Sequence, residues 1–311
     1  MSKILITGAT GFVGSNLTKK LVKRNYEVHI LNEPNCDKKR LSEVLPKINQ
    51  HTANLLEKEK LNNLIKEINP EIIFHLAAAG IFNGISAPEK ELIEVNFMGT
   101  INLINACNQI DYKCFVNTGS SSEYGPKDKP MKETDICQPT NLYAISKLAA
   151  VLYGNLTAKI KNKPIIGLRL FSPYGPFDNE KRLIPYVISK ALKNEDILLA
   201  DPNGTRDFIF IEDVVSAYLK SIDLASQFKG QIFNLGSGKQ TFVSEIVKII
   251  SQITKTKSKI KWGQAKPRPW DTTNWQADIS KISKSFIWKP EYSLKQGLEK
   301  TVLWFNKKRL D

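Results

Sequence analysis

The sequence contains few of the residues that build disulfide-linked, metal-bound or membrane-spanning folds. Its 311 residues include four cysteines: Cys36, Cys107, Cys114 and Cys137. They form no CxxC pair and stand at no spacing from histidine that suits zinc, so we expect reduced thiols and no metal site. No apolar run reaches the roughly 18 residues of a membrane span, and the start, MSKILITGAT, lacks the long apolar region of a secretion signal. We therefore expect a cytoplasmic protein with no membrane partner.

Acidic residues are also scarce relative to basic ones: the chain has 31 Asp and Glu against 45 Lys and Arg, a net charge of +14. Residues 255–311 carry +9 of this excess, much of it as isolated lysines that alternate with Thr, Ser and Ile between Lys255 and Lys261, as on one exposed face of a strand. The basic residues do not interleave with aromatic ones as in single-strand binders. We interpret the charge as a solvated lysine-rich surface with a bias toward anionic substrates, and we expect no nucleic-acid partner.

Strands and helices alternate in the first half of the chain. Strands are predicted at 3–7, 27–31, 71–77, 113–118 and 164–170, with helical periodicity at 56–68 and 92–107. Almost wholly apolar strands separated by helices imply a parallel sheet covered on both faces. We predict an α/β fold with a Rossmann-like, doubly wound sheet over residues 1–172. The turn-rich remainder, 173–311, predicts a smaller C-terminal substrate-binding lobe, with segments near 205–236 returning to the first domain.

A glycine-rich turn joins the first strand to an amphipathic helix, with Gly8, Gly11 and Gly14 in the segment ILITGATGFVG. Glycines let the backbone turn tightly and approach a pyrophosphate, and the helix N-terminus adds positive partial charge. This loop predicts a dinucleotide site that includes Phe12 and Val13 at the start of the helix.

The choice between NAD and NADP depends on the end of the second strand, EVHILNEP. Asn32 stands where the dinucleotide fingerprint expects an acid that bonds the ribose. A neutral Asn32 would not repel a 2′-phosphate, and Lys38, Lys39 and Arg40 follow downstream as either a solvated loop or a phosphate site. Both cofactors stay open.

The stretch NLYAISKLAA places Tyr143 and Lys147 on one face of a predicted helix, since residues four apart are neighbours on a helix surface. Taken alone, this pair favours a packed tyrosine with a solvated lysine over an acid–base pair.

Eight segments in order resemble the extended short-chain dehydrogenase/reductase family of nucleotide-sugar epimerases, dehydratases and reductases. They are GATGFVG (8–14), HLAA (75–78), NTGSSSEYG (117–125), YAISK (143–147), RLFSPYGP (169–176), TRDFIFIEDV (205–214), FNLGSG (233–238) and RPWD (268–271).

The resemblance implies a catalytic set of Ser120, Tyr143 and Lys147. Tyr143 would be the acid–base, and Lys147 would lower the pKa of its phenol and hold the cofactor ribose. Ser120, four residues before the Tyr124-Gly125 pair, would orient the substrate hydroxyl. Further cofactor residues implied by the family are Asn54, Leu55, Leu76, Ala77 and Ala78, with Asn54 in place of the family's acid near the adenine. Implied substrate residues are Ser121, Ser172, Leu183, Arg206, Arg268 and Asp271, with Ser172 in place of the usual Asn and with the two arginines at the substrate diphosphate.

The dehydratases of this family carry an acid and a base after the catalytic residue, whereas this chain has Ser121 and Ser122, with Glu123 one place late. Alternation along an extended segment would aim Glu123 away from the position of the dehydratase base. Dehydration is therefore disfavoured, and hydride chemistry at C4 of a nucleotide-diphosphate sugar, by a 4-epimerase or a 4-keto-sugar reductase, is expected. The alternative is a non-catalytic or RNA-binding relative that uses the basic surface. A homodimer is left open.

Overall fold

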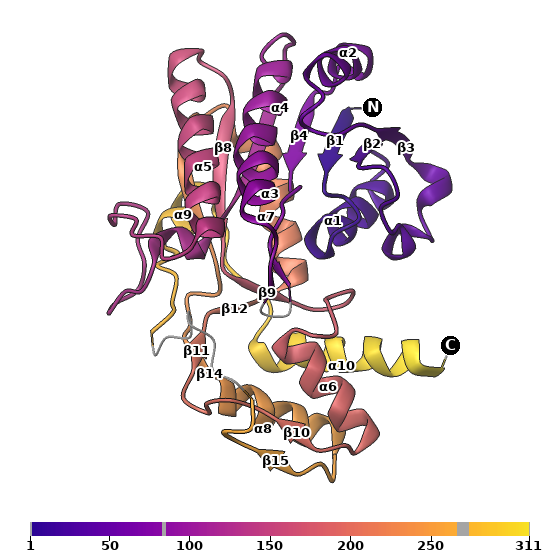
Figure 1. Ribbon diagram of the computed structural model, residues 1–311, viewed down its shortest axis with the longest axis vertical. Coiled ribbons are helices and arrows are strands. Elements are labelled where there is room, and N and C mark those ends of the chain that lie inside the picture. Colours follow the sequence, from indigo (N-terminus) through magenta and orange to yellow (C-terminus); the bar gives the residue numbers. More distant parts are fainter. Residues whose placement is uncertain (1, 83–84, 266–273, 311) are drawn as a thin grey trace.

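The computed structural model describes residues 2–82, 85–265 and 274–310. Its centre is a seven-stranded, wholly parallel sheet in the order β13-β8-β7-β4-β1-β2-β3 (Figure 1). The strands are β1 (Lys3–Thr7), β2 (Glu27–Asn32), β3 (Asn49–Thr52), β4 (Ile72–His75), β7 (Cys114–Ser120), β8 (Ile165–Leu170) and β13 (Ile232–Leu235). The predicted Rossmann-like, doubly wound sheet is confirmed.

Apolar side chains fill both faces of the sheet, because alternate residues of one strand enter different cores. In β1, Ile4 and Ile6 belong to one core and Leu5 to the other. Leu17 of α1 (Phe12–Lys23) and Val214 of α7 (Ile211–Leu224) pack into the first core, which α9 (Ser280–Phe286) extends. The second core is covered by α2 (Lys58–Ile68), α4 (Gly99–Cys107) and α5 (Leu142–Ile160). This layering matches the nearly continuous apolar strands of the sequence.

Two local predictions about this domain need correction. Strand β3, with the sequence NQHT, was not predicted; it carries no apolar residue because it is the outer strand of the sheet. The helix expected over 92–107 is instead divided into α3 (Glu89–Ile93), one π-helical turn (Glu94–Met98) and α4. Short 3₁₀ turns at Lys39–Leu41, Leu45–Lys47 and Ser121–Tyr124 and a hairpin of β5 (Ile81–Phe82) and β6 (Ile85–Ser86) complete the connections.

The smaller lobe lies below the carboxyl ends of the sheet strands (Figure 1). Its described residues form short strand pairs and helices, namely β9 (Ser172–Tyr174) with β12 (Phe208–Phe210), β10 (Ile197–Leu198) with β15 (Ile260–Lys261), β11 (Thr205–Arg206) with β14 (Thr241–Phe242), and α6 (Leu183–Lys193), α8 (Val243–Thr254) and α10 (Leu294–Leu310). Between these elements the chain returns to the sheet as α7 and β13. The lysine-rich strand expected from Lys255 is confined to Ile260–Lys261, because Lys255 ends α8 with a left-handed backbone (φ 51°).

The strand order positions the site. The chain leaves β1 in opposite directions, toward β2 and β3 on one side and toward β4, β7 and β8 on the other. Ligands of open α/β sheets bind outside the carboxyl ends of the strands where the order reverses in this way. Here Thr7, Asn32, His75 and Ser120 end β1, β2, β4 and β7.

Candidate active site

The three glycines of the first loop have different structural roles. Gly8 has φ +71°, and a Cβ on it would lie 2.5 Å from the backbone nitrogen of Ala77, so only glycine lets the loop rest on the segment after β4. A Cβ on Gly14 would collide with the carbonyl oxygen of Gly8. Gly11, in contrast, is exposed, and a Cβ there would meet only the Gly8 oxygen, at 3.2 Å. Gly8 and Gly14 therefore shape the loop, whereas Gly11 leaves the space above it open.

Helix α1 begins after Gly11 without a side-chain cap. The first N–H groups of a helix have no partner within the helix and carry positive partial charge. This helix start can therefore accept a phosphate, and Phe12 and Val13 lie in its first turn.

Two asparagines lie at the ends of neighbouring strands. Asn32 is buried, and among the described residues its Nδ2 finds no hydrogen-bond acceptor. Asn54 uses its Oδ1 to accept the N–H of Leu56 at 2.9 Å, which fixes the turn before α2. Leu55 is buried, and its carbonyl accepts a bond from Asn102 Nδ2 at 2.9 Å. Asn32 thus offers a buried donor at the place predicted for the ribose.

The basic residues downstream of β2 already make protein contacts. Lys38 Nζ donates to Gln50 Oε1 at 2.8 Å. Arg40 Nε donates to the carbonyl of Phe177 at 2.8 Å, and its Nη1 to the carbonyl of Thr10 at 3.3 Å. Arg40 therefore ties the glycine loop to the smaller lobe.

Strand β7 and helix α5 bring the three predicted catalytic residues together. Ser120 ends β7, and Tyr143 lies in the first turn of α5, close enough for the Ser120 side chain to lower the pKa of the Tyr143 phenol. Asn141 begins this helix by accepting the N–H of Ala144 on its Oδ1 at 2.9 Å. Lys147 lies one turn further along the same helix face and is 3% exposed.

Burial controls the protonation of this set. Burial raises the pKa of Tyr143, the side chain of Ser120 opposes this effect, and the charge of Glu123 raises the pKa further. Burial lowers the pKa of Lys147 to about 8, against the opposing effect of Glu123. The expectation that Lys147 lowers the pKa of the Tyr143 phenol is therefore wrong for the protein alone, because desolvation and a nearby carboxylate dominate.

The sequence reading missed a polar residue that supports Tyr143. Asn96, in the π-helical turn, is fully buried and donates from Nδ2 to Ser146 Oγ at 3.0 Å and to the carbonyl of Ala79 at 2.9 Å. Ser146 Oγ donates in turn to the carbonyl of Tyr143 at 2.8 Å. Asn96 thereby links the segment after β4 to the start of α5. Its signal in the sequence is an asparagine between Val95 and Phe97 in an otherwise apolar helical stretch.

His75 extends this buried polar chain to β1. Its Nδ1 lies 2.6 Å from Thr7 Oγ1, and its Nε2 lies 2.8 Å from Thr100 Oγ1. Burial, helped by the positive charge of Lys147, lowers the pKa of His75 to about 3. This imidazole is neutral at physiological pH and joins three elements rather than carrying protons.

The segment after Ser120 forms a 3₁₀ turn, Ser121–Tyr124, and not the extended chain assumed from the sequence. As expected, the Glu123 carboxylate points away from the position of the dehydratase base. The cause is its own hydrogen bonds and not the alternation of an extended strand. Its Oε1 accepts the N–H of Ser120 at 2.7 Å, and its Oε2 lies 2.7 Å from Arg169 Nε. Glu123 is fully buried and Arg169 is 2% exposed.

Trp275, which the sequence reading did not select, lies between two of the predicted substrate residues, Ser121 and Arg206. Its Nε1 donates to Ser121 Oγ at 3.2 Å, and the guanidinium carbon of Arg206 lies 5.6 Å from its ring centroid. Ser172 begins β9 and donates its N–H to the carbonyl of Asp207 at 3.0 Å, while Leu183 begins α6. Arg268 and Asp271 lie outside the described residues.

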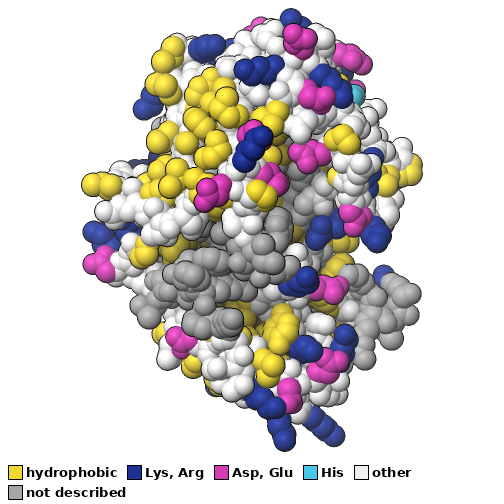
Figure 2. Space-filling model, viewed as in Figure 1, with side chains coloured by type: hydrophobic (Ala, Val, Ile, Leu, Met, Phe, Trp, Pro, Cys, Tyr) yellow, Lys and Arg dark blue, Asp and Glu magenta, His cyan; other side chains and the backbone are white. Residues whose placement is uncertain are grey.

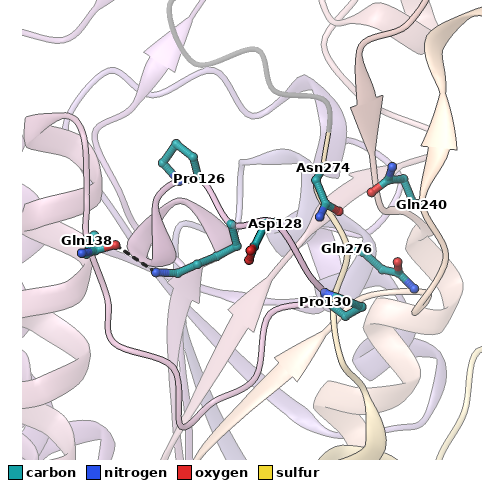
Figure 3. Close-up of a pocket in the computed structure, with 8 residues that line it drawn as sticks. Pro126, Asp128, Pro130, Gln138, Gln240, Asn274 and Gln276 are labelled. Carbon is teal, nitrogen blue, oxygen red and sulfur yellow. Dashed lines mark hydrogen bonds between the residues drawn. The ribbon is translucent and has the colours of Figure 1, made fainter.

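A hollow of about 1050 Å³ lies between the loop at Pro126–Pro130 and the segment that carries Asn274 and Gln276 (Figure 3). Four carboxamides line it, from Gln138, Gln240, Asn274 and Gln276. Lys127 Nζ donates to Gln138 Oε1 at 3.2 Å. Ser120, Tyr143 and Lys147 do not line this hollow.

This chain is similar to known proteins over most of its length. A family model described as the NAD dependent epimerase/dehydratase family matches residues 4–236. The chain belongs to this family. It is 31% identical to a putative UDP-glucose 4-epimerase of Methanocaldococcus jannaschii, over 97% of each chain. It is also 31% identical to a UDP-N-acetyl-alpha-D-glucosaminuronate decarboxylase of Bacillus cytotoxicus, over 97% of each.

Solved structures agree with this assignment. The UDP-glucuronic acid 4-epimerase of Bacillus cereus, in complex with UDP-glucuronic acid and NAD, superposes with a TM-score of 0.88 at 25% identity over 98% of this chain and 99% of that one. Among the described residues, no helix is long and apolar enough to cross a membrane, and no group of three or more His, Cys, Asp or Glu side chains could hold a metal ion.

The residues of this epimerase/dehydratase chain fit a nicotinamide dinucleotide. The uncapped start of α1 suits a pyrophosphate, the open space above Gly11 admits it, and the unpaired Nδ2 of buried Asn32 offers a donor to a ribose oxygen.

Proposed function

We propose that this chain is a nucleotide-sugar 4-epimerase or 4-keto-sugar reductase that uses NAD or NADP. The observation that carries the proposal is the placement of Ser120 at the end of β7 beside Tyr143 in the first turn of α5, with buried Lys147 one turn along that helix, at the carboxyl edge where the glycine loop lies. The 31% identity to a putative UDP-glucose 4-epimerase supports this reaction class.

In this mechanism the protein moves a proton while the bound cofactor supplies hydride transfer at the sugar carbon. Tyr143 Oη takes the proton from the C4 hydroxyl, or returns it, and Ser120 Oγ holds that hydroxyl and the phenol in line. Lys147 would bond the cofactor ribose. Positioned acid–base assistance of this kind contributes typically about 10²–10⁴-fold to a rate.

The cofactor would be held by the loop and the strand ends. Gly8, Gly11 and Gly14, with Phe12 and Val13, bind the pyrophosphate; Asn32 bonds the adenosine ribose. Asn54 and Leu55 border the adenine, and Leu76, Ala77 and Ala78 after β4 lie along the nicotinamide half. NAD in the Bacillus cereus complex supports NAD, whereas neutral Asn32 leaves NADP open.

The substrate would be a nucleotide-diphosphate sugar, as in the UDP-glucuronic acid complex of the Bacillus cereus enzyme. Arg206 and Arg268 would bind the diphosphate, and Asp271 and Leu183 the nucleotide. Ser121 and Ser172 would contact the sugar. We place this site in the lobe of residues 173–311, facing the cofactor domain of residues 1–172. A buried set of side chains, rather than the exposed lysines, forms the site, so we propose a small anionic substrate and no nucleic acid.

Dehydration is not part of the proposal, because Glu123 is committed elsewhere. Both of its carboxylate oxygens are engaged, one by the N–H of Ser120 and one by Arg169. The residues between Ser120 and Glu123 are serines, which lack the acid and the base that water elimination needs.

The test is a screen of UDP-, dTDP-, GDP- and CDP-sugars by thermal shift, followed by activity with each ligand that stabilises the protein. An epimerase interconverts two sugars without net consumption of reduced cofactor, whereas a reductase oxidises NADPH or NADH in proportion to a 4-keto sugar. If no nucleotide sugar raises the unfolding temperature and neither reaction occurs, the proposed function is wrong.

We also propose a second copy of this chain as a partner, through an apolar stripe on α5. Figure 2 shows hydrophobic side chains gathered over this helix, where Ile145, Leu152, Leu156 and Ile160 are 45%, 53%, 55% and 72% exposed. Two chains of net charge +14 repel each other, so a self-contact is best placed on a stripe that contains no charge. Light scattering checks this, with Leu156→Lys expected to give a monomer.

The four cysteines are free, which suits the cytoplasmic location we propose.

A further inference from the structure

One buried ion pair next to the catalytic set is not used by the proposed mechanism. Glu123 Oε2 and Arg169 Nε lie 2.7 Å apart, and both side chains are almost fully withdrawn from solvent. Arg169 also donates from Nη2 to Cys137 Sγ at 3.2 Å and lies 4.5 Å above the ring of Tyr124. A buried ion pair is often no more stabilising than an apolar pair of the same volume. Its presence here calls for a role other than stability.

The carboxylate is connected to Ser120 through the backbone. Glu123 accepts the N–H of Ser120 at 2.7 Å, while Ser120 Oγ accepts the N–H of Ser122 at 3.2 Å. This reciprocal capping fixes where β7 ends and which way the Ser120 hydroxyl points.

The lack of a side chain at Gly119 leaves space for the Glu123 carboxylate. A Cβ on Gly119 would lie 2.5 Å from Glu123 Oε1, so a side chain at 119 would push the carboxylate off Ser120.

Glu123 also acts on the catalytic residues through its charge. The negative charge of Glu123 raises the pKa of Tyr143 and that of Lys147. The other charged and titratable groups that face these two residues are His75 of β4, whose low pKa keeps it neutral, and Arg182, whose charge opposes that of Glu123 at Tyr143. Glu123 is thus the carboxylate that acts on both catalytic groups.

We propose that Glu123, held by Arg169 and admitted by Gly119, is a positioning residue that fixes the Ser120 hydroxyl and keeps Lys147 in its ammonium form. This inference rests on the proposed function, since it concerns the same three catalytic residues.

The variant that tests this proposal must not leave one buried charge without its partner, because removing a single member of a buried ion pair is strongly destabilising. The double variant Glu123→Gln with Arg169→Gln removes both charges, and the two amides can bond to each other. The amide oxygen at position 123 can still accept the N–H of Ser120. The matched control is Glu133→Gln, which changes another half-buried carboxyl, one that accepts the N–H of Asn234 at 2.7 Å and has no charge effect on Tyr143 or Lys147.

The first measurement needs neither substrate nor cofactor. Lysines labelled with ¹³C at Cε are titrated by NMR, and Lys147→Met assigns the resonance that titrates near 8. Removing the negative charge disfavours the ammonium, so we expect the Lys147 midpoint to move to lower pH in the double variant and to stay in place in Glu133→Gln.

The second measurement is the pH dependence of turnover on whichever nucleotide sugar is active. The same loss of charge lowers the pKa of Tyr143 as well, so both limbs of the profile should move to lower pH. We expect kcat at the wild-type pH optimum to fall because the profile has moved, with KM little changed, since the amide at position 123 still accepts the N–H of Ser120.

The proposal is overturned if the Lys147 midpoint of a folded double variant stays at the wild-type value, or if kcat falls while both limbs keep their positions. The second result would mean a purely structural pair. A chain with no activity on any nucleotide sugar would defeat the proposed function, while the NMR titration would still decide the charge relation between Glu123 and Lys147.

Discussion

The two sides of the candidate site are assembled in different ways. The cofactor side comes from short loops that directly follow β1, β2 and β4, and its geometry is set by glycines and by parallel strands in register, such as Thr7 opposite His75. The substrate side joins segments more than a hundred residues apart, since Trp275 donates to Ser121 across 154 positions of the chain. The first side is determined locally, whereas the second depends on how the smaller lobe docks.

Tyr143 lies between the cofactor side and the substrate side. Its hydroxyl does not help to hold either lobe together. The backbone of its helix is fixed by Asn141 and, through Ser146, by Asn96. The comparison therefore predicts that changes on one side affect one ligand, whereas a change at Tyr143 affects the reaction itself.

The largest effect is expected for Tyr143→Phe, which keeps the ring and removes only the hydroxyl. Turnover should fall by about 10²–10⁴-fold, the usual contribution of general acid–base assistance. Unfolding temperature and cofactor affinity should stay close to wild type, because the backbone contacts of the helix remain. Steady-state kinetics on the active nucleotide sugar checks this, and near-normal turnover would return Tyr143 to a packing role.

The next effect separates two glycines of one loop. Gly14→Ala places a methyl group against the backbone carbonyl of Gly8, which cannot move aside, so we expect a loss of about 3 kcal/mol in unfolding free energy. Gly11→Val should stay folded, because the position is exposed and a Cβ there meets a single atom, the Gly8 carbonyl oxygen at 3.2 Å, but it should abolish cofactor binding. Denaturant unfolding and NADH fluorescence titration of both variants check this. Equal cofactor affinity in Gly11→Val and wild type would remove Gly11 from the site.

Sequence reasoning predicted well the strands that lead to the proposed cofactor side, for physical reasons. The parallel order follows from strands that are almost wholly apolar, such as Ile4–Ile6 within β1, and the predicted strand Lys3–Thr7 is the observed one. The family resemblance selected Ser120, Tyr143 and Lys147, which the structure brings together, although their roles stay proposals. What pattern reasoning could not predict was burial: the ammonium near Tyr143 was expected to lower its pKa, but the desolvation that raises it depends on the folded surroundings.

The substrate side was predicted less completely. Trp275 lies in the sequence TTNWQAD, where nothing distinguishes it from a packed tryptophan until its partner Ser121 is known. Arg169 and Glu123 were likewise read separately, one within RLFSPYGP and one as a displaced acid. Their pairing depends on β7 and β8 being neighbours in the sheet, with Ser120 opposite Leu170.

A smaller effect tests the cofactor side at Asn32. The side chain is buried and neutral, and Asn32→Asp would place a carboxylate beside the ribose, where it repels a 2′-phosphate. The affinity ratio of NAD to NADP should rise by about 10-fold, which corresponds to roughly 1.4 kcal/mol. Titration of both cofactors against both proteins gives the ratio. An unchanged ratio would mean that Asn32 does not face the ribose.

The smallest effect tests the substrate side at Trp275. Trp275→Phe keeps an aromatic surface beside Arg206 but removes the N–H that is donated to Ser121. A hydrogen bond between neutral groups contributes about 1 kcal/mol, so KM for the nucleotide sugar should rise about 5-fold while NADH affinity stays constant. Trp288→Phe is the matched control, because Trp288 Nε1 also donates to a serine hydroxyl, Ser216 Oγ at 2.8 Å, but on helix α7 of the other domain. If Trp275→Phe weakened cofactor binding as much as substrate binding, or if both variants raised KM equally, the two sides would not be independent and the division of the site drawn from the fold would fail.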